Sequence, residues 1–137
     1  QLGKSFFDKT SVTRKNIAKT QLKLGVIFPN EFKEKMTIEN GGSIEQFDNS
    51  WTIYSFSNES DRRRLRWKRS DITGETKNAR QLAHFPSGAV VIAGNETGDK
   101  LILLPTGNGR RLGENMHKWT RETGEVTLIA EDISHLV

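Results

Sequence analysis

The sequence predicts an α+β fold, in which N-terminal helices are followed by an antiparallel sheet connected as a meander and then by a short C-terminal helix. Apolar residues recur at helical spacing before residue 40, whereas the later apolar runs have the length and alternation of strands. Short turns separate these later runs, which favours antiparallel neighbours over helical crossovers. A chain of 137 residues has the length of one domain, so we expect residues 1–137 to form a single domain.

Two helices are expected before the sheet. The first spans residues 8–24, is ended by Gly25 and turns its basic side chains to solvent. Its apolar positions are Val12, Ile17, Ala18, Leu22 and Leu24, and its basic positions are Arg14, Lys15, Lys19 and Lys23. The second begins near Pro29, because proline suits a first helical turn, where its missing N–H has no partner to lose. Its predicted buried residues are Phe32, Met36 and Ile38, and its predicted stop is Asn40-Gly41-Gly42.

Six strand-like runs follow, at residues 43–47, 51–56, 88–93, 100–104, 115–120 and 125–130. Between the second and third runs, the polar segment 58–83 predicts one or two short surface helices, with Asp71 or Thr73 as a cap. Glycine-containing turns separate the last four runs, which predicts at least four antiparallel strands within residues 88–130. Residues 131–137 are expected to form the closing helical turn.

Few residues could support catalysis. The chain has no cysteine, which excludes disulfides, a zinc-finger ligand set and a cysteine nucleophile. Its three histidines, His84, His117 and His135, do not have the spacing of a metal motif, and no Gly-x-Ser-x-Gly sequence is present. The glycine-rich segments 94–100 and 106–111 lack a phosphate-loop sequence and are interpreted as turns, the first stiffened by a side-chain hydrogen bond of Asp99. We therefore predict a protein that is not an enzyme and that has no metal site and no cofactor.

The net charge of +4 is unevenly distributed. Residues 1–27 have six basic side chains and one acidic, and residues 58–80 have eight and four, whereas residues 28–57 and 81–137 have net charges of −3 and −2. A nucleic-acid-binding protein that is basic throughout would not show this division. No apolar stretch approaches the ~20 residues that cross a bilayer, and the lack of cysteine suits a reducing cytoplasm, which is the predicted location. Because the sequence begins at Gln1 rather than Met, we expect translation to start upstream of it.

The strongest candidate for a binding site is the basic run at residues 61–69. The predicted partner-binding residues in it are Arg62, Arg63, Arg64, Arg66 and Trp67. Three interpretations stay open: a charged surface helix, a contact with another protein, for which arginine and tryptophan are favoured anchors, and a nucleic-acid contact made through phosphates and stacked bases.

Several short motifs follow one another in a recognisable order. Phe28-Pro29 and Asn40-Gly41-Gly42 come first, and Phe85-Pro86, Gly98-Asp99 and Trp119 come later, followed by a charged turn that ends in Gly124. This ordered set, over about residues 12–56 and 85–137, resembles the SUKH superfamily of the Smi/Knr type. The resemblance implies structural landmarks at Pro29, Asn40, Gly41, Gly42, Gly98, Asp99, Trp119 and Gly124.

The resemblance also implies function by binding. Bacterial members of the superfamily include immunity proteins that neutralise toxins, often nucleases, by direct contact, and fungal relatives regulate the cell wall. We therefore expect a protein partner, a toxin domain, and keep a nucleic-acid-associated role of the Arg62–Arg69 run as the alternative. The basic total charge departs from this expectation, because an inhibitor of a basic nuclease should present acidic groups. The acidic segments 28–57 and 81–137 leave room for such a surface.

Overall fold

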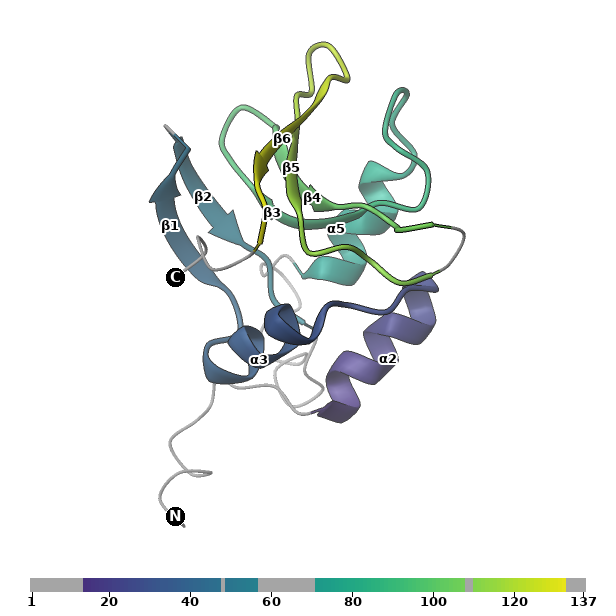
Figure 1. Ribbon diagram of the computed structural model, residues 1–137. Coiled ribbons are helices and arrows are strands. Elements are labelled where there is room, and N and C mark those ends of the chain that lie inside the picture. Colours follow the sequence, from purple (N-terminus) through teal and green to yellow (C-terminus); the bar gives the residue numbers. More distant parts are fainter. Residues whose placement is uncertain (1–13, 48, 57–70, 108–109, 133–137) are drawn as a thin grey trace.

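The computed structural model describes residues 14–47, 49–56, 71–107 and 110–132 (Figure 1). Within these ranges lie three helices, α2 (Arg14–Leu24), α3 (Asn30–Ile38) and α5 (Ile72–Ala79). The strands are β1 (Gly42–Gln46), β2 (Asn49–Ile53), β3 (Val90–Gly94), β4 (Lys100–Leu103), β5 (Met116–Trp119) and β6 (Val126–Ala130). Helices precede the strands and α5 lies between two of them, so the predicted α+β class is confirmed.

The strands form one six-stranded sheet in the order β1-β2-β3-β4-β5-β6, and each strand is antiparallel to its neighbours. This is the predicted meander, with four of its strands within residues 88–130. The predicted run 51–56 differs most from the observed strand, because β2 begins at Asn49 and ends at Ile53. Glu131 and Asp132 form a bend, and the rest of the predicted closing helix lies outside the described residues.

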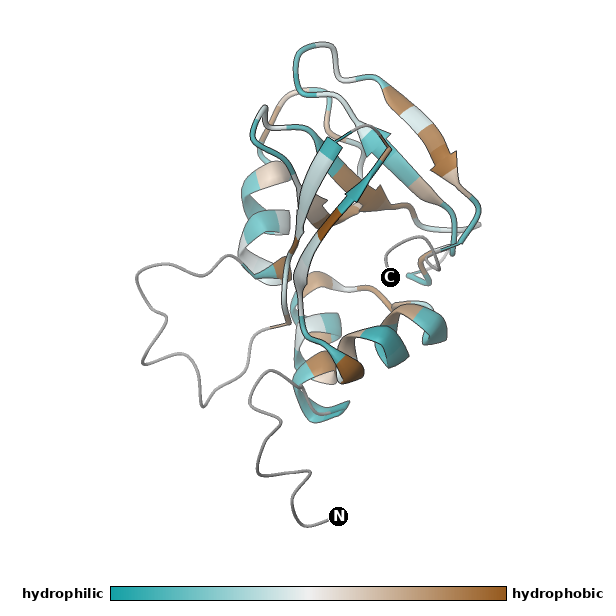
Figure 2. Cartoon of the chain, turned by 90° about the vertical axis from the view of Figure 1, so that its left-hand side faces the viewer, coloured by the Kyte–Doolittle hydropathy of each residue, from teal (hydrophilic) through white to brown (hydrophobic). Residues whose placement is uncertain are grey.

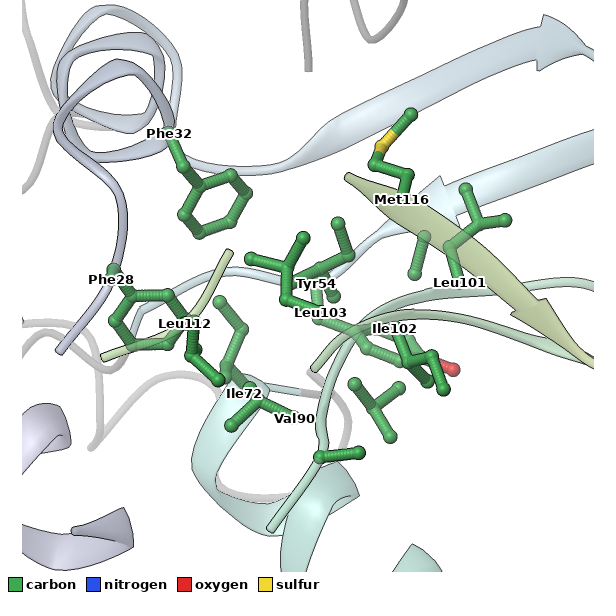
Figure 3. Packing of buried hydrophobic residues seen from close by; sticks show 14 of the residues in the cluster. Phe28, Phe32, Tyr54, Ile72, Val90, Leu101, Ile102, Leu103, Leu112 and Met116 are labelled. Atoms are coloured by element: carbon green, nitrogen blue, oxygen red, sulfur yellow. The ribbon is translucent and has the colours of Figure 1, made fainter. Parts of the chain in front are cut away.

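The core lies on both faces of the central strands β3 and β4. All of β3 is buried, as are Leu101, Ile102 and Leu103 of β4. Phe28, which precedes α3, and Phe32, within α3, belong to the same buried cluster as Leu103 and Met116 (Figure 3). The helix α5 covers the other side, where the hydroxyl of Thr76 accepts a hydrogen bond of 3.0 Å from the Val91 N–H.

Three apolar residues assigned to the buried helix faces, Ala18, Leu22 and Ile38, are exposed. The predicted burial of Leu22 and Ile38 is wrong, because their side chains are 76% and 78% exposed. The buried residues of α2 are Ile17, Thr20 and Leu24, which share one face of the helix, and Leu22 lies on the opposite face. A buried threonine, Thr20, therefore completes the buried face, although it was not among the apolar positions of the predicted helix.

The helix ends follow the expected capping chemistry. Pro29 has an extended conformation and is the N-cap of α3, one position before the first helical turn. Asp71, and not Thr73, caps α5, since its Oδ1 accepts a hydrogen bond of 2.8 Å from the Gly74 N–H. After α5, the Arg80 guanidinium donates to the carbonyls of Leu24 and Ala89, which joins α2 to the start of β3.

Candidate functional site

The arginine run predicted to bind a partner, Arg62 to Trp67, lies outside the described residues. The residues on either side of it are neighbours in the fold. Ser55 and Asp71 form a parallel bridge, and the Ile72 N–H donates a hydrogen bond of 2.8 Å to the Ser55 carbonyl. The basic segment is therefore an insertion whose two anchor points lie side by side, next to the end of β2.

Asn40 holds this anchor point to the helix α3. Its side-chain amide accepts a hydrogen bond of 2.8 Å from the Phe56 N–H and donates one of 3.0 Å to the Phe56 carbonyl. Gly41 lies against the same strand end at a φ of +106°, and a Cβ there would approach the Ile53 carbonyl oxygen to 3.1 Å. Glycine is required at this position because both the backbone conformation and the space exclude a side chain.

An open groove runs over the β1–β2 hairpin, beside this anchor point. Its walls are residues 39–43 and the turn at residues 94–96, and its floor is residues 50–55. A second hollow continues it around the hairpin end, between residues 45–50 and Glu96. We refer to the two together as the acidic groove, since Glu39, Glu45 and Glu96 line it without any lysine or arginine.

The volume and openness of the groove favour a macromolecular partner. The two hollows have about 770 and 750 Å³, but both are open to solvent, unlike the enclosed apolar pockets that bind small ligands. Its three carboxylates are exposed and therefore accessible to a basic protein surface. The arrangement can attract positive charge.

A compact set of contacts fixes the floor of the groove. The Tyr54 hydroxyl accepts a hydrogen bond of 3.0 Å from the Lys100 ammonium, which also lies 3.5 Å from a Glu75 carboxylate oxygen. The Lys100 ammonium lies 5.3 Å from the centre of the Tyr54 ring, at cation–π distance. The same hydroxyl occupies the space that a Cβ at Gly94 would fill, so a side chain there is excluded. These contacts tie the sheet to α5 beneath the groove.

The turn at residues 94–99 forms the second wall and is held by Asn95. The Asn95 Oδ1 accepts hydrogen bonds from the N–H groups of Thr97 and Asp99, at 3.1 and 2.9 Å. We expected Asp99 to stiffen this turn. Its Oδ2 does accept from the Thr97 hydroxyl, at 3.2 Å, but its Oδ1 accepts from the Arg121 N–H, at 3.0 Å, and so connects the β3–β4 turn to the β5–β6 turn.

The remaining landmarks are not among the residues that line the groove. Trp119 is buried in β5, donates a hydrogen bond of 3.1 Å to the His84 carbonyl and packs edge-on against Phe85. Gly98 and Gly124 are in hairpin turns, with φ values of +93° and +77°. These residues support the sheet and its turns, whereas Asn40, Gly41 and Gly42 border the groove.

The acidic groove could not be recognised from the sequence. The one signal for it was the net negative charge of residues 28–57, which contain Glu39 and Glu45. Glu96 joins them only because β2 pairs with β3, which places Thr52 opposite Gly94. That pairing was not predicted residue by residue.

Other kinds of site find little support in the described part of the chain. No three histidine, aspartate or glutamate side chains there are close enough together to hold a metal ion. Burial lowers the pKa of His117, whose Nδ1 has no hydrogen-bond partner among the described residues. Each described helix is too short or too polar to cross a bilayer.

Comparison with known proteins supports the assignment that the motifs suggested. No curated protein matches the chain. The model of the SMI1 / KNR4 family (SUKH-1) matches residues 11–137, which includes the helices, the six strands and the landmark residues. This match covers nearly the whole length, and the chain therefore belongs to the SMI1 / KNR4 family (SUKH-1).

Proposed function

We propose that this protein is a bacterial immunity protein, a single domain over residues 1–137 that neutralises a toxin in the cytoplasm by binding it directly. It acts without enzymatic activity, metal or cofactor. Membership of the SUKH-1 family supports a binding role. The observation that carries the proposal further is the acidic groove, whose lining includes Glu39, Glu45 and Glu96 but no lysine or arginine.

The charge of the groove indicates the kind of toxin surface it fits. A nuclease must present basic side chains to the phosphates of its substrate. Such a surface would face the carboxylates of Glu39, Glu45 and Glu96, and the bound protein would prevent nucleic acid from reaching it. The carboxylates would also accelerate association of the two proteins, since complementary electrostatic fields raise the rate of encounter. Because all three are exposed, each contributes little to affinity by itself, and the main effect is on rate and specificity. We propose a toxin with a basic active surface as the partner.

The basic run is a second proposed contact. Arg62, Arg63, Arg64, Arg66 and Trp67 follow the strand end that Asn40 holds, and this strand end borders the acidic groove. We propose that the partner also contacts these residues, because arginine and tryptophan are effective anchors of protein interfaces.

Charge reversal in the groove tests the proposal. The triple variant Glu39→Lys, Glu45→Lys and Glu96→Lys should slow association with the toxin domain encoded beside this gene by about tenfold or more at low salt, and should abolish protection of cells expressing it. The matched control reverses three other exposed glutamates, Glu34, Glu114 and Glu122, and so has the same net charge. Equal effects of the two triple variants would show that the groove is not the contact.

The nucleic-acid alternative has its own test. We expect labelled single-stranded and duplex DNA to bind with a Kd no tighter than ~10⁻⁵ M near physiological salt, the non-specific range. Submicromolar binding that is steeply salt-dependent and is lost on changing Arg62, Arg63 and Arg64 to alanine would replace the immunity role with the nucleic-acid role.

A further inference from the structure

The strand β6 lies at an edge of the sheet with no strand on its outer side among the described residues. Natural proteins protect such edges with charged side chains or proline, since an open edge can pair with another chain. The other edge, β1, includes Glu45, whereas β6 has the sequence Val-Thr-Leu-Ile-Ala without a charge or a proline. Figure 2 shows β6 as a mainly hydrophobic strand on the outside of the sheet. The edge at β6 is therefore suited to strand addition.

The backbone groups available for pairing follow from the register. Thr120 N–H donates to the Glu125 carbonyl, and Val126, Thr127 and Leu128 lie opposite Trp119, Lys118 and His117. In an antiparallel ladder, hydrogen-bonded and non-hydrogen-bonded pairs alternate. The N–H and C=O groups of Thr127 are therefore directed to β5, and those of Val126 and Leu128 are directed to the open edge.

The side chains of the same two residues form an apolar surface. Val126 is 36% exposed and Leu128 is 50% exposed. They share one face of the strand, because side chains alternate along it, and Val126 lies opposite the buried Trp119. An added strand would thus find hydrogen-bonding groups at the edge and apolar contacts on this face.

The charges that flank β6 identify its occupant. Glu125 and Glu131, immediately before and after the strand, are both exposed. If two copies paired β6 with β6 along its whole length, Leu128 would face its own copy, and Glu125 would face Glu131 at both ends of the pair. Like charges directly opposite each other are destabilising in a sheet. An extended segment with apolar residues at alternate positions and lysine or arginine at its two ends fits the same edge without repulsion.

We infer that β6 binds, by antiparallel strand addition, an extended segment of a partner protein with alternating apolar residues and basic ends. This inference does not depend on the acidic groove or on the immunity role. It would add a second docking surface, distinct from the groove.

Amide hydrogen exchange of the full chain, followed by NMR, tests whether the edge is open. The Val126 and Leu128 amides should exchange rapidly in the free protein, and the Thr127 amide slowly, because it is bonded to β5. Slow exchange of all three would overturn the inference. Protection that increases with protein concentration would identify a second copy as the occupant, and protection independent of concentration would identify the chain's own residues 133–137.

A synthetic peptide of alternating valine and threonine with a lysine at each end tests the occupant. It should protect the Val126 and Leu128 amides and bind about tenfold more tightly than the same peptide with glutamate ends, since two exposed ion pairs replace two repulsions. Leu128→Lys should abolish binding of the lysine-ended peptide, whereas Leu22→Lys, at an exposed leucine on α2, should leave it unchanged. Equal affinity of the two peptides, no binding of either, or equal effects of the two substitutions would overturn the inference.

Discussion

Replacing Asn40 with alanine should destabilise the protein more than its partly exposed position suggests. The substitution removes both partners of the Phe56 backbone, the acceptor of its N–H and the donor to its C=O. The Phe56 side chain is buried between Phe28 and Phe32, so its backbone cannot move freely to reach water. An unsatisfied buried backbone group costs about 1–3 kcal/mol. For two groups with partial access to water, we expect a loss of about 2–4 kcal/mol.

Urea denaturation measures this loss. With a slope of about 2 kcal/mol per molar, the midpoint should fall by about 1–2 M. Asn40→Asp separates the two hydrogen bonds, because it keeps the acceptor for the N–H but places a carboxylate oxygen next to the Phe56 carbonyl. It should therefore be destabilised at neutral pH and should recover part of the loss when acid protonates the carboxyl group. A change within about 0.5 kcal/mol for Asn40→Ala, equal to that of the exposed control Asn115→Ala, would refute the role of Asn40 as a clamp.

Two further substitutions test the groove floor and a half-buried histidine. Gly94→Ala should lower the free energy of unfolding by about 1–3 kcal/mol, because the new Cβ displaces the Tyr54 hydroxyl and breaks its hydrogen bond to Lys100. Tyr54→Phe in the same chain should recover part of that loss. Additive effects of the two substitutions in a double-mutant cycle would contradict the contact. The second substitution, His117→Gln, removes a side chain whose pKa is lowered by burial. Below pH ~6.5 the unfolded chain binds a proton that the folded chain resists, so the wild type should lose stability as the pH falls from about 6.5 towards the folded pKa. Melting curves of both proteins should be recorded between pH 8 and pH 5, a range that includes the unfolded pKa of about 6.5. The melting temperature should fall less for His117→Gln than for the wild type, and parallel curves would exclude His117 as the cause.

The strand order of the sheet could be predicted from the sequence because it depends only on segments that are neighbours along the chain. Each strand pairs with the next one along the chain, so the spacing of turns such as Gly107 and Gly124 already determines the order of the strands. Which helix residues are buried depends on segments that are distant along the chain. Thr20 is buried and Leu22 exposed because α5 and the sheet determine which face of α2 is covered, and no pattern within α2 contains that information.

The site could be predicted only in part. Asn40, Gly41 and Gly42 were identified as a helix stop, but the hydrogen bonds from Asn40 to Phe56 span sixteen positions and depend on the tertiary fold. The acidic groove needs residues from three separate segments, which the β2–β3 pairing brings together. The arginine run was the most conspicuous feature of the sequence, and its contribution to binding stays a prediction.

The division of charge explains how a basic protein can attract a basic partner. The helix α2 has four basic side chains and no acidic one, and it lies on the opposite side of the molecule from the β1–β2 hairpin and its groove (Figure 1). At physiological ionic strength, exposed charges are largely screened beyond about 8 Å. A partner that approaches the groove therefore experiences Glu39, Glu45 and Glu96 before it experiences the charges of α2. At low salt the screening length increases and the total charge of +4 opposes the encounter. A basic partner would thus prefer the groove to the rest of the surface because of the charges near the groove. The net charge and pI of the whole chain do not show this preference.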